Sequence, residues 1–135
     1  MTKVKLGKKE WDILNVQRSS GLVSGIHRDL LILHIPMSVI SFDELFKMVQ
    51  DKTITKAITT TRTDPNDPEA PVSTVAFENY TVNAEPIISV QEATSMETGE
   101  VAQVYVVILG KLTLVEQQNE AILAYFAAQG IKLPG

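Results

Sequence analysis

Residues 100–130 constrain the fold most, because here an apolar strand leads directly into a capped helix. Residues 101–109 read VAQVYVVIL, which is rich in β-branched side chains and apolar at almost every position. A strand that is apolar on both faces belongs inside a sheet that is covered on both sides. Thr113 and Glu116 then have the spacing of a capping box, which predicts a helix from Leu114 to Gln129.

The second half of this predicted helix is apolar nearly all round, since residues 121–128 read AILAYFAA. A helix end that is apolar on every side must be covered, either by its own domain or by another subunit. The small size of the domain favours another subunit, and we expect a homo-oligomer. The predicted interface residues on this helix are Ile122, Leu123, Tyr125 and Phe126.

Two aromatic residues elsewhere complete the predicted interface. Trp11 is the only tryptophan, and Tyr80 lies close to Phe77 in the sequence. For both residues, a role as a core or interface anchor is favoured over stacking on a ligand or a base. We therefore add Trp11 and Tyr80 to the interface candidates and keep core packing as their alternative.

Length and composition indicate one globular domain, residues 1–135. The chain is long enough for a core without staples, and its 44% hydrophobic and 21% charged residues are too apolar for disorder. The absence of cysteine excludes disulfides, thiolate metal ligands and a cysteine nucleophile, and it fits synthesis inside a cell. No apolar run, residues 104–109 included, is long enough to cross a bilayer, so we expect no membrane partner.

Two charged segments are expected to lie in solvent. Residues 1–10 carry four lysines and are interpreted as a flexible basic arm, with a local basic patch that includes Lys111 as the alternative. The net charge of −4 argues against a nucleic-acid partner. Residues 64–71, DPNDPEAP, predict an exposed loop, because three prolines forbid a regular ladder and the acids favour water.

The remaining segments predict further strands and one more helix. A buried strand is expected at residues 26–35, an edge or half-exposed strand at residues 53–63, and two strands within residues 72–94, broken near residues 83–86. Ser41 and Glu44 form a second capping-box pattern, which predicts a short helix ending near residue 50. The predicted fold is α+β: a mostly antiparallel sheet of about five or six strands with a short middle helix and a longer C-terminal helix.

No arrangement of residues predicts a catalytic, cofactor or metal site. His27 and His34 are seven apart on one predicted strand and so fall on opposite faces, and His34 is expected to be a partly buried, hydrogen-bonded histidine. The oxygen-rich residues 64–69 lack the central glycine and the terminal acid of an EF-hand loop, so a solvated turn is favoured over a metal site. No nucleophile stands beside a base, and we expect the protein not to be an enzyme.

Residues 96–126 combine a Thr-Gly-Glu turn, a valine-rich strand and a polar helix capped by Leu-Thr, and residues 41–49 and 78–81 add a helix and a strand. In these features the chain resembles small proteins encoded in the structural-gene region of phages and prophages of Gram-positive bacteria. The resemblance implies a virion component of the tail, baseplate or capsid surface, made in the host bacterial cytoplasm and assembled with itself and other virion proteins. That group carries no motif with defined chemistry, so no functional residue is transferred.

A second hypothesis is a small phage-encoded protein that binds and inhibits a host protein, such as part of a defence system. The acids of residues 64–69, together with Glu97 and Glu100, would form a negative surface suited to mimicry of nucleic acid.

Overall fold

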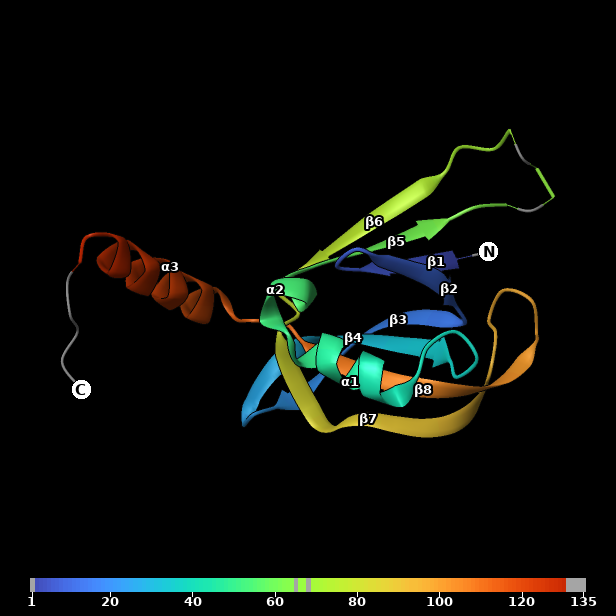
Figure 1. Cartoon of the computed structure of the whole chain (residues 1–135), viewed down its shortest axis with the longest axis horizontal. Helices are drawn as coiled ribbons and strands as arrows, with labels where there is room; N and C mark the ends of the chain where they lie inside the picture. Colours follow the sequence, from blue (N-terminus) through green and yellow to red (C-terminus); the bar gives the residue numbers. More distant parts are fainter. Residues whose placement is uncertain (1, 65, 68, 131–135) are drawn as a thin grey trace.

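The described residues form two antiparallel sheets of four strands each, with three helices (Figure 1). We analysed a computed structural model, which describes residues 2–64, 66–67 and 69–130. The first sheet has the order β2-β1-β5-β6, with β1 Thr2–Leu6, β2 Lys9–Ile13, β5 Ala57–Arg62 and β6 Ser73–Glu78. The second has the order β3-β4-β8-β7, with β3 Asn15–Val23, β4 Ile26–Pro36, β8 Val101–Gly110 and β7 Val82–Thr94. The α+β class is confirmed, but the strands number eight and form two sheets instead of one.

The apolar strand β8 lies inside the second sheet, between β4 and β7, as its sequence predicted. In the β4–β8 register Leu31 is opposite Leu109 and Leu33 is opposite Val107, and all four side chains are fully buried. These residues belong to a core cluster that also includes residues of the first sheet, such as Ile58. The two sheets therefore share one hydrophobic core.

The helix α1 (Phe42–Gln50) begins and ends where the capping pattern predicted. The Ser41 hydroxyl accepts a hydrogen bond from the Glu44 backbone N–H at 3.3 Å, and Leu45 and Val49 face the core. The short helix α2 (Lys52–Thr55) was not predicted and occupies the start of the expected strand at residues 53–63. Asp51 caps α2 by accepting the Thr53 backbone N–H at 2.9 Å.

The expected basic arm at residues 1–10 is wrong, because β1 and β2 form a hairpin there. Val4 and Leu6 are fully buried while Lys3 and Lys5 point to solvent, which is the period-two alternation of a strand with one face covered. Strand β1 also pairs with β5. Residues 57–62 therefore form an internal strand, so the edge alternative is wrong, whereas the half-exposed alternative is right, since Ile58 and Thr60 are buried and Ala57 and Arg62 are exposed.

Residues 72–94 form two strands as predicted, but the break between the strands lies at a different place. The break between β6 and β7 falls at residues 79–81, whereas the expected break near residues 83–86 is an irregularity in the β7–β8 register between Asn83 and Ile88. The described residues of the 64–71 loop are exposed or half-exposed and form no strand. Pro65 and Pro68 of this loop lie outside the described residues.

The helix α3 (Leu114–Ala128) extends away from both sheets (Figure 1). Thr113 and Glu116 form the predicted capping box, and Gly130 has a φ of +71° just beyond the last turn, a conformation that suits glycine at a helix end. No residue of α3 is buried. The helix is therefore formed as predicted, but its apolar half has no cover within the described chain.

Candidate assembly surface

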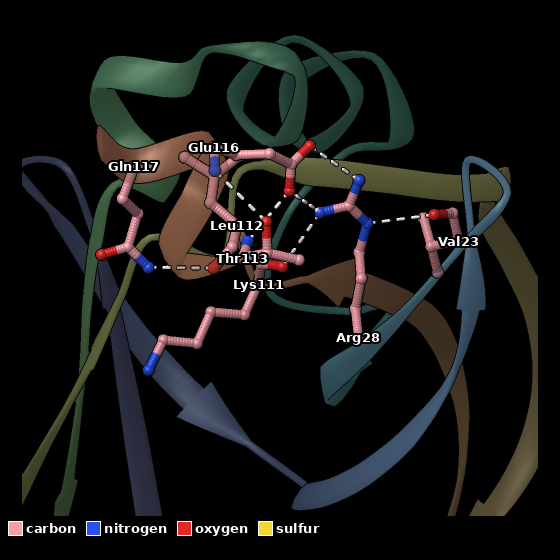
Figure 2. A network of polar contacts seen from close by, with 7 residues as sticks. All are labelled: Val23, Arg28, Lys111, Leu112, Thr113, Glu116 and Gln117. Carbon is pink, nitrogen blue, oxygen red and sulfur yellow. Dashed lines mark hydrogen bonds and ion pairs between the residues drawn. The ribbon is translucent and has the colours of Figure 1, made fainter. Parts of the chain in front are cut away.

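The helix α3 is held to the body by a buried arginine at its root (Figure 2). Arg28 projects from β4 and is 4% exposed. Its Nε donates to the Val23 carbonyl at 3.0 Å, and its Nη1 donates to the Lys111 carbonyl at 3.2 Å. Both terminal nitrogens also bind Glu116, with Nη2 to Oε2 at 3.0 Å. This two-pronged arrangement is the strongest ion-pair geometry available to arginine, and it fixes the position of Glu116.

Glu116 also completes the cap of the helix that it anchors. Its Oε1 accepts the Thr113 backbone N–H at 2.9 Å, while the Thr113 hydroxyl accepts the Glu116 backbone N–H at 3.2 Å. Gln117 adds a bond from Nε2 to the Leu112 carbonyl at 2.9 Å. The hydrogen bonds and charge of Arg28, with the Thr113 N–H, lower the pKa of Glu116 to about 2. The carboxylate is therefore ionised at neutral pH, where it also favours the positive end of the helix dipole.

The link between β8 and α3 is fixed by backbone contacts as well. The Lys111 N–H donates to the Asp29 carbonyl and the Leu112 N–H donates to the Asn79 carbonyl, both at 2.9 Å. Gly110 ends β8 directly beside Arg28, where an added Cβ would lie 2.9 Å from the arginine Cδ. A side chain at this position would displace the arginine. Gly110, the backbone hydrogen bonds of Lys111 and Leu112, and the Arg28–Glu116 ion pair together fix the direction in which α3 leaves the body.

Beyond this root the helix presents an uncovered apolar surface, which we call the α3 arm face. Its large members and their exposed fractions are Leu114 68%, Val115 64%, Ile122 50%, Leu123 50% and Tyr125 61%. By helical spacing Val115, Ile122 and Tyr125 leave the helix on a different side from Glu116, which points into the body. Each of these five residues is at least half exposed, and no residue of the helix is buried. An exposed apolar surface of this kind marks a candidate interaction site.

The structure separates the six predicted interface residues into two groups. Ile122, Leu123 and Tyr125 are exposed on the α3 arm face, and Phe126 is half-exposed with its ring centroid 5.9 Å from that of Tyr125. Tyr80 is 6% exposed and packs edge-on against Phe77 in the core, so the interface role is wrong for it and the core alternative is right.

Trp11, the remaining candidate, is half-exposed on β2 and packs against the core. Its Nε1 is buried and has no hydrogen-bond partner among the described residues. The structure therefore does not bring Trp11 together with the α3 arm face.

Sequence reasoning missed the two residues that set the direction of α3. Arg28 stands between His27 and Asp29 at the polar start of β4, and the capping box pointed to Glu116 only as a helix cap. Nothing local indicated their ion pair, because the two residues are 88 positions apart along the chain. The exposure of Leu114 and Val115 was also missed, because both belong to the half of the helix that reads as polar.

The two histidines lie in different environments, as predicted from their spacing. His27 is exposed, whereas His34 is buried and its Nδ1 lies 3.0 Å from the Asn15 Nδ2. Burial lowers the pKa of His34. Among the described residues no three His, Asp or Glu side chains are grouped as a metal site would require.

Of the acids in the second hypothesis, the structure brings Asp64 and Glu97 to one cleft, beside an arginine, whereas Asp67, Glu69 and Glu100 do not line it. A cleft of about 400 Å³ is lined by Asp64, Glu97 and Arg62, among others. Glu97 accepts from the Thr2 hydroxyl at 2.7 Å and lies 3.3 Å from the Arg62 Nε, and these contacts lower its pKa. The backbone N–H groups of Asn66 and Glu69 donate to the carboxylates of Asp64 and Asp67, as in turns. The positive charge of Arg62 therefore offsets part of the negative charge of Asp64 and Glu97 at this cleft.

Comparison with known proteins finds no similar family, curated protein or solved structure. None of the helices in the described ranges is long and apolar enough to span a membrane.

Proposed function

We propose that this protein is a non-enzymatic assembly protein of a phage particle, in the tail, baseplate or capsid surface. It acts by binding copies of itself and other virion proteins through the α3 arm face. The observation that carries the proposal is a helix with a buried, charge-paired root and no buried residue of its own.

The energetics favour a partner for this helix. Covering apolar side chains contributes about 25 cal/mol per Å² removed from water, which is set against a cost of association of several to about 15 kcal/mol. Ordering a flexible arm would add to that cost. The contacts of Arg28 and Glu116 hold the root of the arm before binding, so less ordering remains to be done.

The assignment to a phage particle rests on the sequence resemblance of residues 96–126. This stretch forms β8, the turn before it and most of α3, including the root of the arm. The segment that resembles phage structural proteins is therefore the segment that supplies the proposed contact.

The self-assembly part of the proposal is tested with a double variant, Ile122→Glu with Leu123→Glu. We expect it to be a folded monomer under conditions in which the unaltered chain assembles, since two carboxylates would have to be desolvated at the contact. Leu22→Glu is the matched control, because Leu22 is 74% exposed on β3 and lies off the helix. The proposal fails if the arm variant and the control assemble alike.

The particle part is tested by mass spectrometry of purified virions from a strain that carries the gene. The protein should be present at a fixed ratio to the other particle proteins. Its absence from particles, together with capture of a host enzyme from a lysate, would instead support the alternative of a small host-protein inhibitor, which the acids around Asp64 and Glu97 would serve.

A further inference from the structure

A second surface lies between the edges of the two sheets. Strand β3 is an edge of the second sheet and β6 is an edge of the first, and a cleft of about 490 Å³ opens between them. Val16, Val75, Phe77 and Met96 give the cleft apolar walls. Met96 is 68% exposed, so the cleft has an apolar rim that is open to solvent. We name this surface the β3–β6 cleft.

We propose that the β3–β6 cleft binds the C-terminal half of α3 from a second copy of the chain, so that copies join head to tail. The inference rests on the proposed function, in which α3 is an assembly arm, and it names the partner surface of that arm. The uncharged segment 121–128, with Tyr125 and Phe126, supplies the side chains that enter the cleft.

Charge complementarity supports this pairing. Arg18, Arg62 and Glu97 line the cleft. Glu97 lies 3.3 Å from the Arg62 Nε, so Arg18, whose guanidinium lies 4.8 Å from the centre of the Phe77 ring, is the cation that faces a partner. The helix Leu114–Ala128 contains no lysine or arginine, and it carries Glu120. Its last carbonyl groups form the negative end of the helix dipole, which cations stabilise. Arg18 gives the cleft a cation that the helix lacks, and a cation there favours the carbonyl end of the helix.

The arm does not occupy the cleft of its own chain. No residue of α3 is buried, and none lines the cleft. In Figure 1 α3 leaves the body on the side opposite to the loop that precedes β6. Each copy therefore offers one arm and one cleft on different sides. Such a contact closes into a ring or continues as an open stack, depending on the rotation between copies.

The first test is a cysteine cross-link, for which the chain provides a clean background because it contains no cysteine. The variants Met96→Cys and Leu123→Cys are mixed under mild oxidation. A seated arm brings the two positions close enough to bond, and we expect at least ten times more mixed disulfide than with Leu22→Cys in place of Met96→Cys. Equal yields from the two mixtures would overturn the inference.

The second test is complementation between an arm variant and a cleft variant. The arm variant is Ile122→Glu with Leu123→Glu, and the cleft variant is Val75→Glu with Met96→Glu. Circular dichroism first establishes that both are folded. Head-to-tail contact predicts that each is monomeric alone and that an equimolar mixture forms dimers that grow no further, since only one intact arm meets one intact cleft.

The outcomes separate this inference from the proposed function. If the cleft variant alone assembles like the unaltered chain, the cleft is not the partner surface, and the function proposed for α3 stands. If the unaltered chain is monomeric at every concentration, self-assembly itself fails and both proposals fall. Dimers formed only by the mixture support both.

Discussion

Replacing Glu116 by glutamine removes the charge at the root of α3 while keeping the shape of the side chain. Glutamine can still accept the Thr113 N–H, because a capping box tolerates either residue. The amide oxygen can also accept one bond from Arg28. What is lost is the negative charge opposite a guanidinium that is 4% exposed. The substitution therefore isolates the electrostatic part of the contact.

The magnitude follows from the bonds involved. Glu116 binds two nitrogens of Arg28, and hydrogen bonds between charged groups contribute about 1.5–3 kcal/mol each, against about 0.5–1.5 kcal/mol for neutral ones. Because the Glu116 side chain is 31% exposed, water replaces part of the loss. We expect the free energy of unfolding at pH 7 to fall by about 2 kcal/mol, measured in denaturant by the fluorescence of Trp11, the only tryptophan.

The effect of Glu116→Gln should depend on pH in a defined direction. The pKa of Glu116 is lowered from its ordinary value of 4.5 to about 2 in the folded protein. A carboxylate of this kind contributes its full stability above pH 4.5 and loses it as the pH falls towards 2, by at most about 1.4 kcal/mol per pH unit. The difference in unfolding free energy between the unaltered chain and Glu116→Gln should therefore be constant above pH 5 and shrink below pH 4.5.

Glu120→Gln is the matched control, since Glu120 is exposed one turn further along the same helix. It should change stability by less than about 0.5 kcal/mol at pH 7. A difference for Glu116→Gln that is equal at pH 3 and pH 7 would refute the reasoning, as would equal effects of the two substitutions.

Three further predictions concern the body of the protein. Gly110→Ala places a Cβ 2.9 Å from the Arg28 Cδ and should lower the free energy of unfolding by about 1–3 kcal/mol in denaturant melts. Gly21→Ala should lower it by less, because its Cβ would lie 3.2 Å from the end of a flexible leucine side chain. The reverse order of the two effects would contradict the packing at the root of α3. Because the pKa of His34 is lowered in the folded protein, the unfolded chain binds a proton at a higher pH than the folded one, and stability should fall as the pH drops below 6.5. In thermal melts at pH 5 to 7.5, a His34→Gln variant should lack this dependence of the midpoint on pH. Trp11→Phe removes a buried N–H without a partner among the described residues and should change the thermal midpoint by no more than a few degrees; a large loss would mean that this N–H is bonded.

Local signals in the sequence predicted the two longer helices, α1 and α3, and the central strand. The caps at Ser41 and Thr113 set where α1 and α3 begin, and the unbroken apolar run of β8 placed it inside a sheet. In each case the determining residues lie within a few positions of the element. The eight consecutive apolar residues in the second half of α3 predicted a helix end that needs cover from its own domain or from another subunit, and the described residues of its own chain do not bury it.

What the sequence did not predict depends on contacts between distant segments. The hairpin β1–β2 was misread because its lysines outweighed the alternation of Val4 and Leu6. The internal position of β5 follows from its pairing with β1, more than fifty residues earlier. Arg28 and Glu116 are 88 residues apart, and only the folded chain brings them together.

The central claim, that this chain works by assembling through α3, is tested most directly by the molar mass of the unaltered chain in solution. Sedimentation velocity over a hundredfold range of concentration should give a mass that rises above the 14.9 kDa of one chain, in whole multiples. The Ile122→Glu, Leu123→Glu variant should stay at 14.9 kDa throughout. A single chain at every concentration, with the α3 arm face intact, would contradict the claim.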